Sequence, residues 1–268
     1  MERPGWATDD VDIEHPSPAR MYDYYLGGSH NFAVDRRMAR QAIEQWPDLP
    51  LIMQANRAFL RRSVRYLVSQ GIRQFLDVGS GIPTKGNVHE VAQVASPEAR
   101  VVYVDIDPVA IAHNRAILAG NRRADIVQAD LRDATMIFED PRVRRLLDLS
   151  QPVGVLMVAM LHFIPEEADP ATIVALYRKM MPPGSYLVIS HATHEGQPDQ
   201  AGAHIELYWR AGAPLTMRSR REIEALLEGF DLVPPGMVFM PLWRPDSPVD
   251  VDDHPERFTG YALVGRRR

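Results

Sequence analysis

From Gly71 onward, short apolar runs rich in β-branched residues alternate with helical patterns of ten or more residues. The runs are QFLDVGSG (74–81), RVVYVDID (100–107), ADIVQAD (124–130), VGVLMVAML (153–161) and SYLVISH (185–191). Nearly continuous apolar strands that alternate with helices are typical of a parallel sheet covered on both faces. The pattern therefore predicts an α/β fold with a doubly wound, mostly parallel sheet.

Several predicted helices of this region carry start signals. These are two capping boxes, Asn87 with Glu90 and Ser219 with Glu222, and two aspartates that stand before a proline, Asp107 and Asp169. Such residues satisfy the free backbone N–H groups of a first helical turn. We expect the helix that follows Ser219 to end at Gly229, and two closing strands at 236–243 and 258–265.

The front of the chain has a different character. Residues 1–19 contain five carboxylates and no sustained periodicity, so we expect an arm that is ordered only if it docks on the rest of the protein. Helical spacing follows, interrupted by prolines, and predicts helices at about 34–45 and 52–69. We therefore divide the chain into an N-terminal arm and helical cap, 1–70, and a core domain, 71–268.

The composition of the 268-residue chain narrows the classes of function. A net charge of -5 and a pI near 6.0 disfavour a nucleic-acid partner, because such binding needs clustered Lys and Arg. The chain has no cysteine, which excludes disulfides, thiolate nucleophiles and Cys-ligated zinc. No apolar run approaches the ~18 residues that span a bilayer, and the N-terminus has no secretory apolar segment. We expect a cytoplasmic protein with no membrane partner.

The turn after the first predicted strand of the core contains closely spaced glycines. In FLDVGSGIPTKGN (75–87), Gly79, Ser80 and Gly81 lie between a strand and a helix start, where backbone can approach a ligand. Two glycines also occur in such turns for steric reasons alone. The dinucleotide pattern G-x-G-x-x-G needs a third glycine where Thr84 stands, and a P-loop would need a lysine and a hydroxyl that are missing. The loop therefore predicts neither a dinucleotide nor a phosphate cradle.

Three carboxylates follow successive predicted strands: Asp77, Asp105 and Asp130. Carboxyl ends of neighbouring parallel strands line one crevice, so we expect the three acids to face one ligand. Asp105, with Ile106 beside it, suits ribose hydroxyls, and Asp130, with the Leu131 backbone N–H, suits an adenine. Asp77 either contacts an amino group or only orients the loop, and Asp130 alternatively starts a turn. S-adenosylmethionine has an amino group, a ribose and an adenine, and it has no pyrophosphate to be repelled.

With these residues in view, the chain resembles class I S-adenosylmethionine-dependent methyltransferases. More narrowly, it resembles a bacterial family of predicted S-adenosyl methyltransferases long labelled as a domain of unknown function. The matching stretches include ARMYDYYLGGSHNFAVDR, GIRQFLDVGSGIPTKGNVHEVAQ, ARVVYVDIDPVAIAH, LHFIPEE and FMPLWRP, and they run from about residue 15 to 245. The resemblance implies a Rossmann-like, seven-stranded sheet whose last strand is antiparallel, S-adenosylmethionine as cofactor, and methyl transfer as the reaction. Pro83 stands where the broad class often has a third glycine.

The segment RMYDYYLGGSHNF (20–32) places three tyrosines ahead of two glycines. Aromatic faces stabilise a nearby cation such as a sulfonium by roughly 0.5–2 kcal/mol. One hypothesis is therefore that the arm and first helices fold over the cofactor, with a bend at Gly27-Gly28 that lets Tyr22, Tyr24 and Tyr25 reach it. The alternative is that the tyrosines fill a seam between helices and sheet.

Two histidines follow the fourth and fifth predicted strands, His162 in MLHFIP and His191 in SHATHE. A neutral imidazole can accept a proton from an oxygen or nitrogen nucleophile, which makes both candidate catalytic residues. A purely structural role is the alternative. His191, His194 and Glu195 lack the i, i+4 spacing of a zinc-binding helix, and we predict no metal site.

The acceptor of the methyl group is only indirectly constrained. The stretch after the fourth strand lacks the Asn/Asp-Pro-Pro-Tyr element of amino-group nucleic-acid methyltransferases, so a small molecule is the favoured substrate. Two other functions stay open: a non-catalytic regulatory module that binds S-adenosylmethionine or a metabolite, and an NAD-dependent oxidoreductase. The glycine pattern and the lack of a Tyr-x-x-x-Lys set disfavour the oxidoreductase. A homodimer is one assembly compatible with the sequence.

Overall fold

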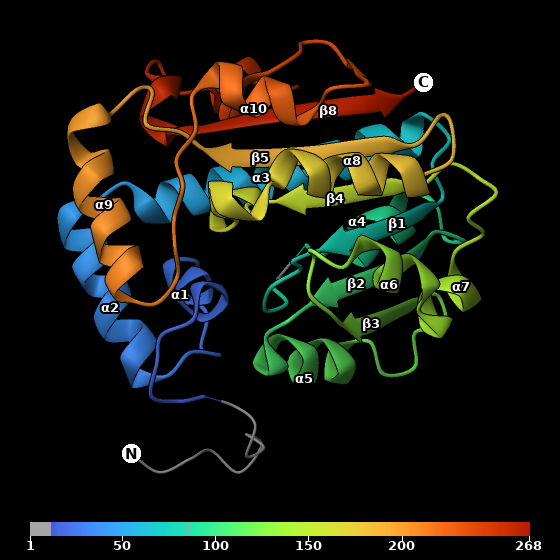
Figure 1. The fold of residues 1–268 in the computed structure, drawn as a ribbon, viewed down its shortest axis with the longest axis horizontal. Helices are drawn as coiled ribbons and strands as arrows, with labels where there is room; N and C mark the ends of the chain where they lie inside the picture. The colour runs from blue at the N-terminus through green and yellow to red at the C-terminus, as the bar shows by residue number, and fades with distance from the viewer. Residues whose placement is uncertain (1–11, 85) are drawn as a thin grey trace.

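A central sheet of eight strands, with helices on both faces, organises the part of the chain that the computed structural model describes, residues 12–84 and 86–268 (Figure 1). The strands are β1 (Gln74–Val78), β2 (Arg100–Asp105), β3 (Ala124–Gln128), β4 (Gly154–Val158), β5 (Tyr186–Ala192), β6 (Phe230–Leu232), β7 (Val238–Phe239) and β8 (Gly260–Arg267). Seven of them follow the order β3-β2-β1-β4-β5-β8-β6, and β7 pairs with β8 beside this path. Strands β1 to β5 are parallel, and β8 is antiparallel to β5. The predicted doubly wound sheet with an antiparallel last strand is thereby confirmed, and β7 adds an eighth strand to the seven that the resemblance implied.

The closing part of the sheet differs in detail from the prediction. The predicted strand at 258–265 corresponds to β8, but only Val238–Phe239 of the segment 236–243 forms a strand. A 3₁₀ turn, η3 (Met240–Leu242), follows directly and contains Pro241. Proline has no N–H for a strand ladder, which explains why the apolar run does not continue as a strand. The outer neighbour of β8 on the main path is instead the three-residue β6, which is too short to give a periodic pattern.

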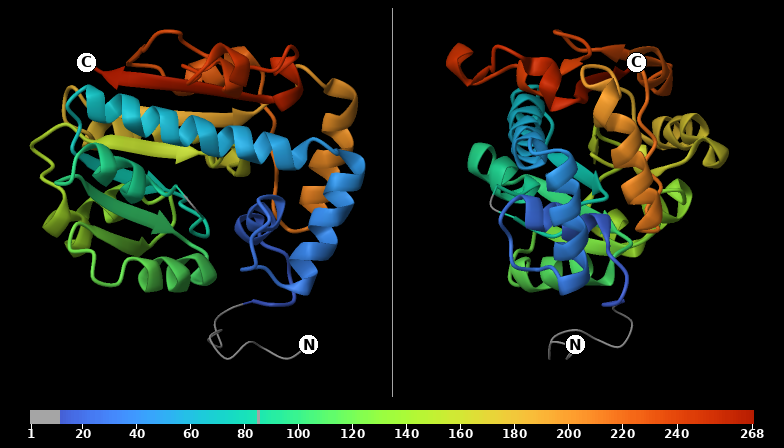
Figure 2. Two further views of the ribbon diagram at one scale, coloured as in Figure 1. Left: turned by 180° about the vertical axis from the view of Figure 1, so that it is seen from behind. Right: turned by 90° about the vertical axis from the view of Figure 1, so that its left-hand side faces the viewer.

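Helices cover the two faces of the sheet. They are α1 (Pro18–Tyr25), α2 (Ala33–Gln45), α3 (Leu49–Ser69), α4 (Val88–Ala95), α5 (Pro108–Ile117), α6 (Ala134–Glu139), α7 (Pro141–Leu146), α8 (Pro170–Met180), α9 (Pro198–Arg210) and α10 (Arg220–Leu226). The alternation along β1 shows how two cores arise. Phe75 packs with residues of α3, α4 and α5 on one face, and Leu76 packs with α6, α8 and α10 on the other. Figure 2 shows α3 running across the first of these faces.

The predicted helix starts are confirmed. Both capping boxes are present, at Asn87 for α4 and at Ser219 for α10. The Asp107 side chain accepts a hydrogen bond from the Val109 N–H, and the Asp169 side chain accepts one from Thr172. Helix α10 ends at Leu226, three residues before the predicted stop. The cap residues therefore fix where these helices begin more firmly than where they end.

The N-terminal region contains one helix that the pattern did not predict. Helices α2 and α3 match the predicted 34–45 and 52–69, with α3 beginning at Leu49 and taking Pro50 into its first turn. Helix α1 begins at Pro18, inside the predicted arm 1–19, whose first eleven residues lie outside the described part of the chain. Eight residues are too few for a clear helical period, and α1 is held by tertiary contacts instead.

Helices α1, α2 and α9 stand opposite the carboxyl ends of the parallel strands, to which the arrowheads of β1 to β5 point in Figure 1. Helix α9 comes from the segment assigned to the core, yet it joins the N-terminal helices. The Tyr25 and Tyr208 hydroxyls are hydrogen-bonded at 3.0 Å, and the Trp46 and His204 rings meet with centroids 5.3 Å apart. The layer over the strand ends is therefore built from both segments. No helix in the described residues is both long and apolar enough to cross a membrane.

Candidate active site

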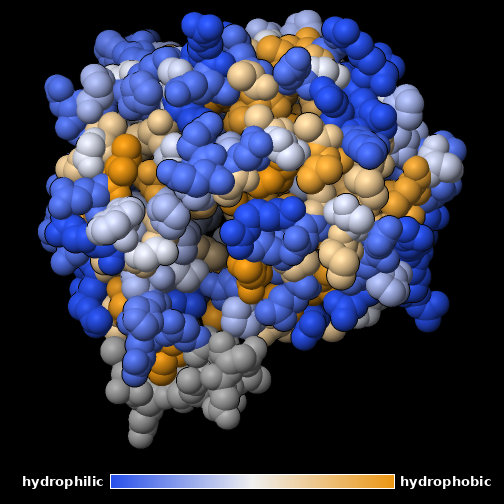
Figure 3. All heavy atoms as spheres, in the orientation of Figure 1, coloured by the Kyte–Doolittle hydropathy of each residue, from blue (hydrophilic) through white to orange (hydrophobic). Residues whose placement is uncertain are grey.

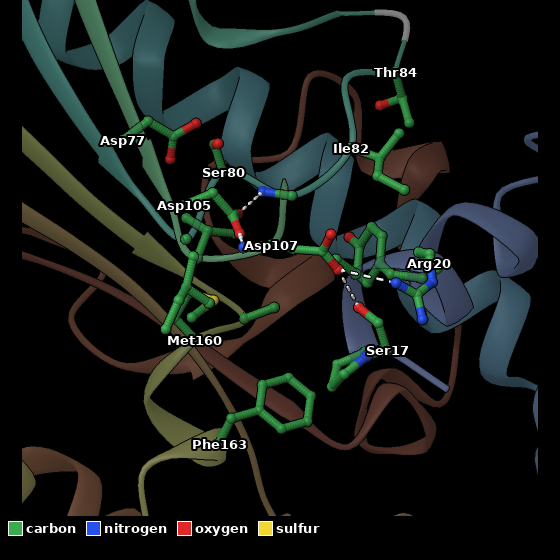
Figure 4. A pocket seen from close by; sticks show the side chains of 18 of the residues that line it. Ser17, Arg20, Asp77, Ser80, Ile82, Thr84, Asp105, Asp107, Met160 and Phe163 are labelled. Atoms are coloured by element: carbon green, nitrogen blue, oxygen red, sulfur yellow. Dashed lines mark hydrogen bonds and ion pairs between the residues drawn. The ribbon is translucent and has the colours of Figure 1, made fainter. Parts of the chain in front are cut away.

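A cavity of about 430 Å³ lies at the carboxyl ends of β1, β2 and β4, beneath the N-terminal segment (Figure 4). The loop after β1 lines it with Gly79, Ser80 and Gly81, and the end of β2 lines it with Asp105 and Ile106. The opposite wall comes from the segment that leads into α1. In the space-filling view, the surface is hollowed between the N-terminal helices and the strand ends, where hydrophilic and hydrophobic residues are interspersed (Figure 3). The volume is in the range of sites that bind a small molecule or cofactor.

Asp77, at the end of β1, is the least satisfied acid of this cavity. Its side chain is buried, and no hydrogen-bond donor to its carboxylate is found among the residues that the structure describes. Burial raises the pKa of Asp77 to about 7, the Arg57 charge opposes this rise, and the neighbouring Asp105 adds to it. A buried carboxylate in this state gains stability from a cation or a hydrogen-bond donor on a ligand.

Asp105, at the end of β2, ties the glycine loop to the next strand. Its two carboxylate oxygens accept hydrogen bonds from the backbone N–H groups of Gly81 at 2.6 Å and Asp107 at 2.9 Å. Burial raises the pKa of Asp105 to about 6 in spite of these bonds. Each carboxylate oxygen can accept a second hydrogen bond, so Asp105 retains capacity for the hydroxyls of a ligand.

The glycine loop is shaped by a close contact with the segment after β4. Gly79 has a φ of +74°, and a Cβ atom at this position would lie 2.1 Å from the Met160 sulfur. Only glycine allows both the left-handed backbone and this approach. Ser80 Oγ and Thr84 Oγ1 are buried and have no hydrogen-bond partner in the described part of the chain. The loop therefore presents two unused hydroxyl groups at the cavity.

The structure does not bring the third predicted acid, Asp130, to this cavity. Its carboxylate forms a salt bridge with Arg132, two residues further along, and this partner lowers the pKa of Asp130. Leu131 is buried in the core on the other face of the sheet, where its carbonyl accepts a hydrogen bond from the Tyr177 hydroxyl at 2.9 Å. Two of the three acids thus converge. The strand pattern could not show that a neighbour in sequence would bind the third.

A different acid, Asp107, completes the charged wall. Sequence analysis indicated a helix cap, and Asp107 is one, but it also lines the cavity and holds the N-terminal segment. Its Oδ2 accepts a hydrogen bond from Ser17 Oγ at 2.6 Å, and the Arg20 guanidinium lies 3.6 Å away. Arg20 is itself buried and paired with Asp35 at 2.9 Å. Together these contacts fasten the start of α1 over the cavity, and those of Asp107 with Ser17 and Arg20 are marked in Figure 4.

The N-terminal tyrosines divide between the two hypotheses made for them. Tyr22 lines the cavity, as the lid hypothesis requires, and its hydroxyl accepts a hydrogen bond from Asn56 at 2.8 Å. Tyr25 does not line it and instead packs against α9 through Tyr208, in agreement with the packing alternative.

The two glycines after these tyrosines form a tight turn. Gly27 has a φ of +77°, and a Cβ on Gly28 would lie 2.0 Å from Asp23 Oδ1. The Asp23 carboxylate accepts hydrogen bonds from the His30 N–H and the Asn31 amide, each at 2.8 Å. The pair is therefore required by local geometry rather than by a hinge motion.

A second cavity of about 90 Å³ adjoins the first. Both are lined by Tyr22, Asn56 and Phe163, together with Pro18 and Ala159. Beyond this shared wall the small cavity lies among α2, α3, α9 and the ends of β4 and β5, and most of its lining is apolar or aromatic. The site thus has a large charged compartment and a small apolar one.

Comparison with known proteins identifies the family of this chain. A family model described as S-adenosyl methyltransferase matches residues 4–268. The chain belongs to this family of S-adenosyl methyltransferases. The family implies S-adenosylmethionine as the cofactor, as the sequence predicted.

Solved structures agree with this assignment. A DUF574 family protein from Streptomyces avermitilis is 38% identical over 96% of this chain and 99% of that chain, with a TM-score of 0.92. A putative methyltransferase from Thermobifida fusca is 40% identical over 98% and 99% of the two chains, also with a TM-score of 0.92. PigF, solved with SAH, is 19% identical over 88% and 69%, with a TM-score of 0.50, and shares the fold. No curated protein matches the chain.

The large cavity of this methyltransferase fits S-adenosylmethionine by its chemistry. The cofactor carries a cationic amino group, and Asp77 is a buried carboxylate to which no described residue donates a hydrogen bond. It also carries ribose hydroxyls, and Asp105 retains acceptor capacity at the end of β2. The Ser80 hydroxyl, which has no partner in the described part of the chain, lies near these two acids in Figure 4. The hydrogen-bonding groups of the cavity therefore complement those of the cofactor.

His162 of the methyltransferase lies in η1 (Leu161–Phe163), where it lines the small cavity. Its Nδ1 accepts a hydrogen bond from the Ala192 N–H at 3.2 Å, and burial lowers its pKa well below the ordinary value. A neutral ring that accepts at Nδ1 carries its proton on Nε2. Nε2 can thus only donate a hydrogen bond, and Nδ1, the acceptor nitrogen, is already bonded to the Ala192 N–H.

His191 is engaged at both ring nitrogens. Nδ1 donates to the Ala192 carbonyl at 2.8 Å, and Nε2 accepts from the Arg218 guanidinium at 3.0 Å. Burial lowers the pKa of His191 to about 3. This environment is that of a structural residue. Among the described residues, no group of three or more His, Asp or Glu is arranged to hold a metal ion.

Sequence reasoning missed two residues of the small cavity, Trp46 at the end of α2 and His204 on α9. They are 158 positions apart, and neither stands beside a glycine loop or a strand end. Only the packing of α9 on α2 brings them together, so no local signal was present to find them.

Proposed function

We propose that the protein transfers a methyl group from S-adenosylmethionine to a small-molecule acceptor that occupies the 90 Å³ cavity. The observation that carries this proposal is the shared wall, because a methyl group can pass only between compartments that adjoin. The mainly apolar lining of the small cavity favours a small organic acceptor. The net charge of -5 argues against a nucleic acid.

The large cavity offers a role for each residue that the sequence predicted and the fold assembled there. Asp77 binds the amino group, and Asp105 binds the ribose hydroxyls. The backbone of Gly79 and Gly81 allows close approach of the cofactor. Ile106, an apolar side chain that is 61% exposed, offers a surface for the adenine. When bound, the cofactor supplies an electrophilic methyl group on a sulfonium.

The protein's own contribution is positioning and the exclusion of water. Holding two reacting groups in a near-attack geometry can supply ~7–11 kcal/mol of a barrier, without any acid or base. Tyr22 and Phe163 at the shared wall present aromatic surface where a sulfonium would be stabilised. The segment fastened by Ser17 and Arg20 covers one side of the cavity.

Calorimetry with S-adenosylmethionine tests the cofactor site. Asp77→Asn removes the charge but keeps the shape of the side chain. No hydrogen bond to the described protein is lost in this change. We expect the affinity for S-adenosylmethionine to fall about 10–100-fold. Asp231→Asn, an exposed carboxylate on β6, is the matched control and should bind like wild type. Asp130→Asn should leave the affinity unchanged, because Asp130 is paired with Arg132 and does not line the cavity.

Transfer is tested separately with labelled S-adenosylmethionine and the small-molecule fraction of a cell extract. The proposal predicts label in a product of low molecular mass, absent from the Asp77→Asn reaction. Cofactor binding without any transferred label would favour the regulatory module instead.

A further inference from the structure

Two side chains that line the small cavity each carry a buried polar atom with no hydrogen-bond partner in the described part of the chain. The atoms are Nδ1 of His204 and Nε1 of Trp46. Only 5% of His204 and 2% of Trp46 is exposed, and both side chains line the cavity. Buried polar groups are almost always paired, because an unpaired one destabilises a protein. Two orphan atoms in one cavity therefore point to a ligand.

The two atoms are of opposite kinds. The indole N–H of Trp46 can only donate a hydrogen bond. Burial lowers the pKa of His204 to about 4, so the ring is neutral and one of its nitrogens is an acceptor. The two rings are in edge-to-face contact, with centroids 5.3 Å apart and an interplanar angle of 78°. A hydroxyl group both donates and accepts, so one hydroxyl can satisfy this pair.

Several other polar side chains around the cavity form hydrogen bonds within the described protein. His162 and His191 are bonded as described above, and Tyr208 is bonded to Tyr25. Ser190 donates to the Asn56 side chain at 2.5 Å. His204 and Trp46 differ from these residues because each has a buried polar atom without a partner among the described residues.

The remaining wall sets the size and polarity of the occupant. It is formed mainly by apolar side chains, among them Leu49, Ile52, Met53 and Met217. A cavity of about 90 Å³ is smaller than the ~150 Å³ apolar cavity that holds a benzene molecule. A ring bound there would therefore extend past Tyr22 and Phe163 toward the large cavity. The compartment therefore suits one end of a molecule, a single ring or a short apolar chain.

We propose that the small cavity binds the methyl acceptor through a hydroxyl group that donates to His204 Nδ1 and accepts from Trp46 Nε1, on an aromatic or short apolar skeleton. This inference rests on the proposed function, since it names the acceptor class for the same site. His204 and Trp46 act here as substrate-binding residues, and no proton transfer to His204 is required.

Phenol and toluene are the probes, because they share a shape and differ in the hydroxyl group. Their dissociation constants are measured by NMR titration, with the histidine ring nitrogen signals observed directly. In the wild type, we expect phenol to shift the His204 nitrogen signals and toluene not to do so. His204→Phe and Trp46→Phe keep an aromatic ring and remove the polar atom. Each should weaken phenol binding about tenfold and leave toluene binding within about twofold. His254→Phe, the same change at an exposed histidine, should bind both probes like wild type.

Unchanged phenol affinity in both cavity variants would overturn the proposal, as would the absence of any binding of either probe to the folded wild type. The wild-type nitrogen shifts decide the question if a variant does not fold. Calorimetry with S-adenosylmethionine on the same samples separates the two levels. Normal cofactor binding with failed phenol recognition overturns the acceptor class alone, whereas a wild type that binds no cofactor overturns the proposed function.

Discussion

The carboxyl ends of β1 and β2 carry buried acids, whereas buried histidines lie at or just after the ends of β4 and β5. At the ends of β1 and β2, burial raises the pKa of Asp77 to about 7 and of Asp105 to about 6. At the ends of β4 and β5, burial lowers the pKa of His162 and takes that of His191 to about 3. All four groups are driven toward their neutral forms by the same desolvation. A shifted pKa therefore does not by itself distinguish a binding group from a structural one.

The hydrogen-bond partners make the distinction. Asp77 has no donor in the described protein, while both nitrogens of His191 are occupied. The acids are open toward a ligand, and the histidines are held by their surroundings. Three predictions test this difference, and they are ordered by the size of the effect.

The largest effect is expected from Arg218, which holds the histidine side together. This buried guanidinium donates to the carbonyls of Leu161 and Ile164 and to His191 Nε2. Arg218→Met leaves these acceptors without a donor, so the free energy of unfolding should fall by about 3–5 kcal/mol in urea denaturation. Arg210→Met, which breaks an exposed pair on α9, should change it by less than about 1 kcal/mol. Equal effects of the two changes would mean that the histidine side is not held in this way.

The second prediction concerns the pH dependence of stability on the acid side. Asp77 titrates near 3.8 when unfolded and at about 7 when folded. Between these values the unfolded state has released its proton while the folded state keeps one, so stability falls as pH rises from about 4 to about 7. From pH 5 to pH 8 the wild type should therefore lose up to about 3 kcal/mol relative to Asp77→Asn.

Urea denaturation of both proteins at the two pH values provides the measurement. A difference between wild type and variant that stays constant with pH would show that Asp77 is not buried as a neutral acid.

The smallest effect is expected at His162. Asn can accept the Ala192 N–H in place of the imidazole Nδ1, so His162→Asn preserves the bond that the structure shows. We expect the rate of label transfer to stay within about threefold of wild type. A general base contributes about 10²–10⁴ in rate. A loss of that size in a folded variant would show that His162 acts as a general base.

Most of the fold could be predicted from the sequence, because strands and helix starts depend on local residue patterns. The apolar runs at 74–81 and 100–107 are strands, and the cap at Asn87 begins α4 where its spacing indicated. Asp77 and Asp105 reach one cavity because the topology of a parallel sheet requires it. Helix α1 and strand β6 were missed because eight and three residues carry too little periodicity.

Only part of the candidate site could be predicted from the sequence. Asp130 is bound by Arg132, His191 is bound by Arg218, and Trp46 meets His204 across 158 positions of sequence. None of these pairings follows from spacing, since each depends on the rotamers and packing of side chains from separate segments.

By itself, the sequence determined the sheet, the glycine turn, the two converging acids and the family to which the chain belongs. These depend on hydrophobic periodicity, capping and motif spacing, which act over a few residues. Only the tertiary structure decided which buried groups are open and which are satisfied, and where the small cavity lies. The physical reason is that a hydrogen bond between distant segments exists only once packing has brought its two partners within about 3 Å.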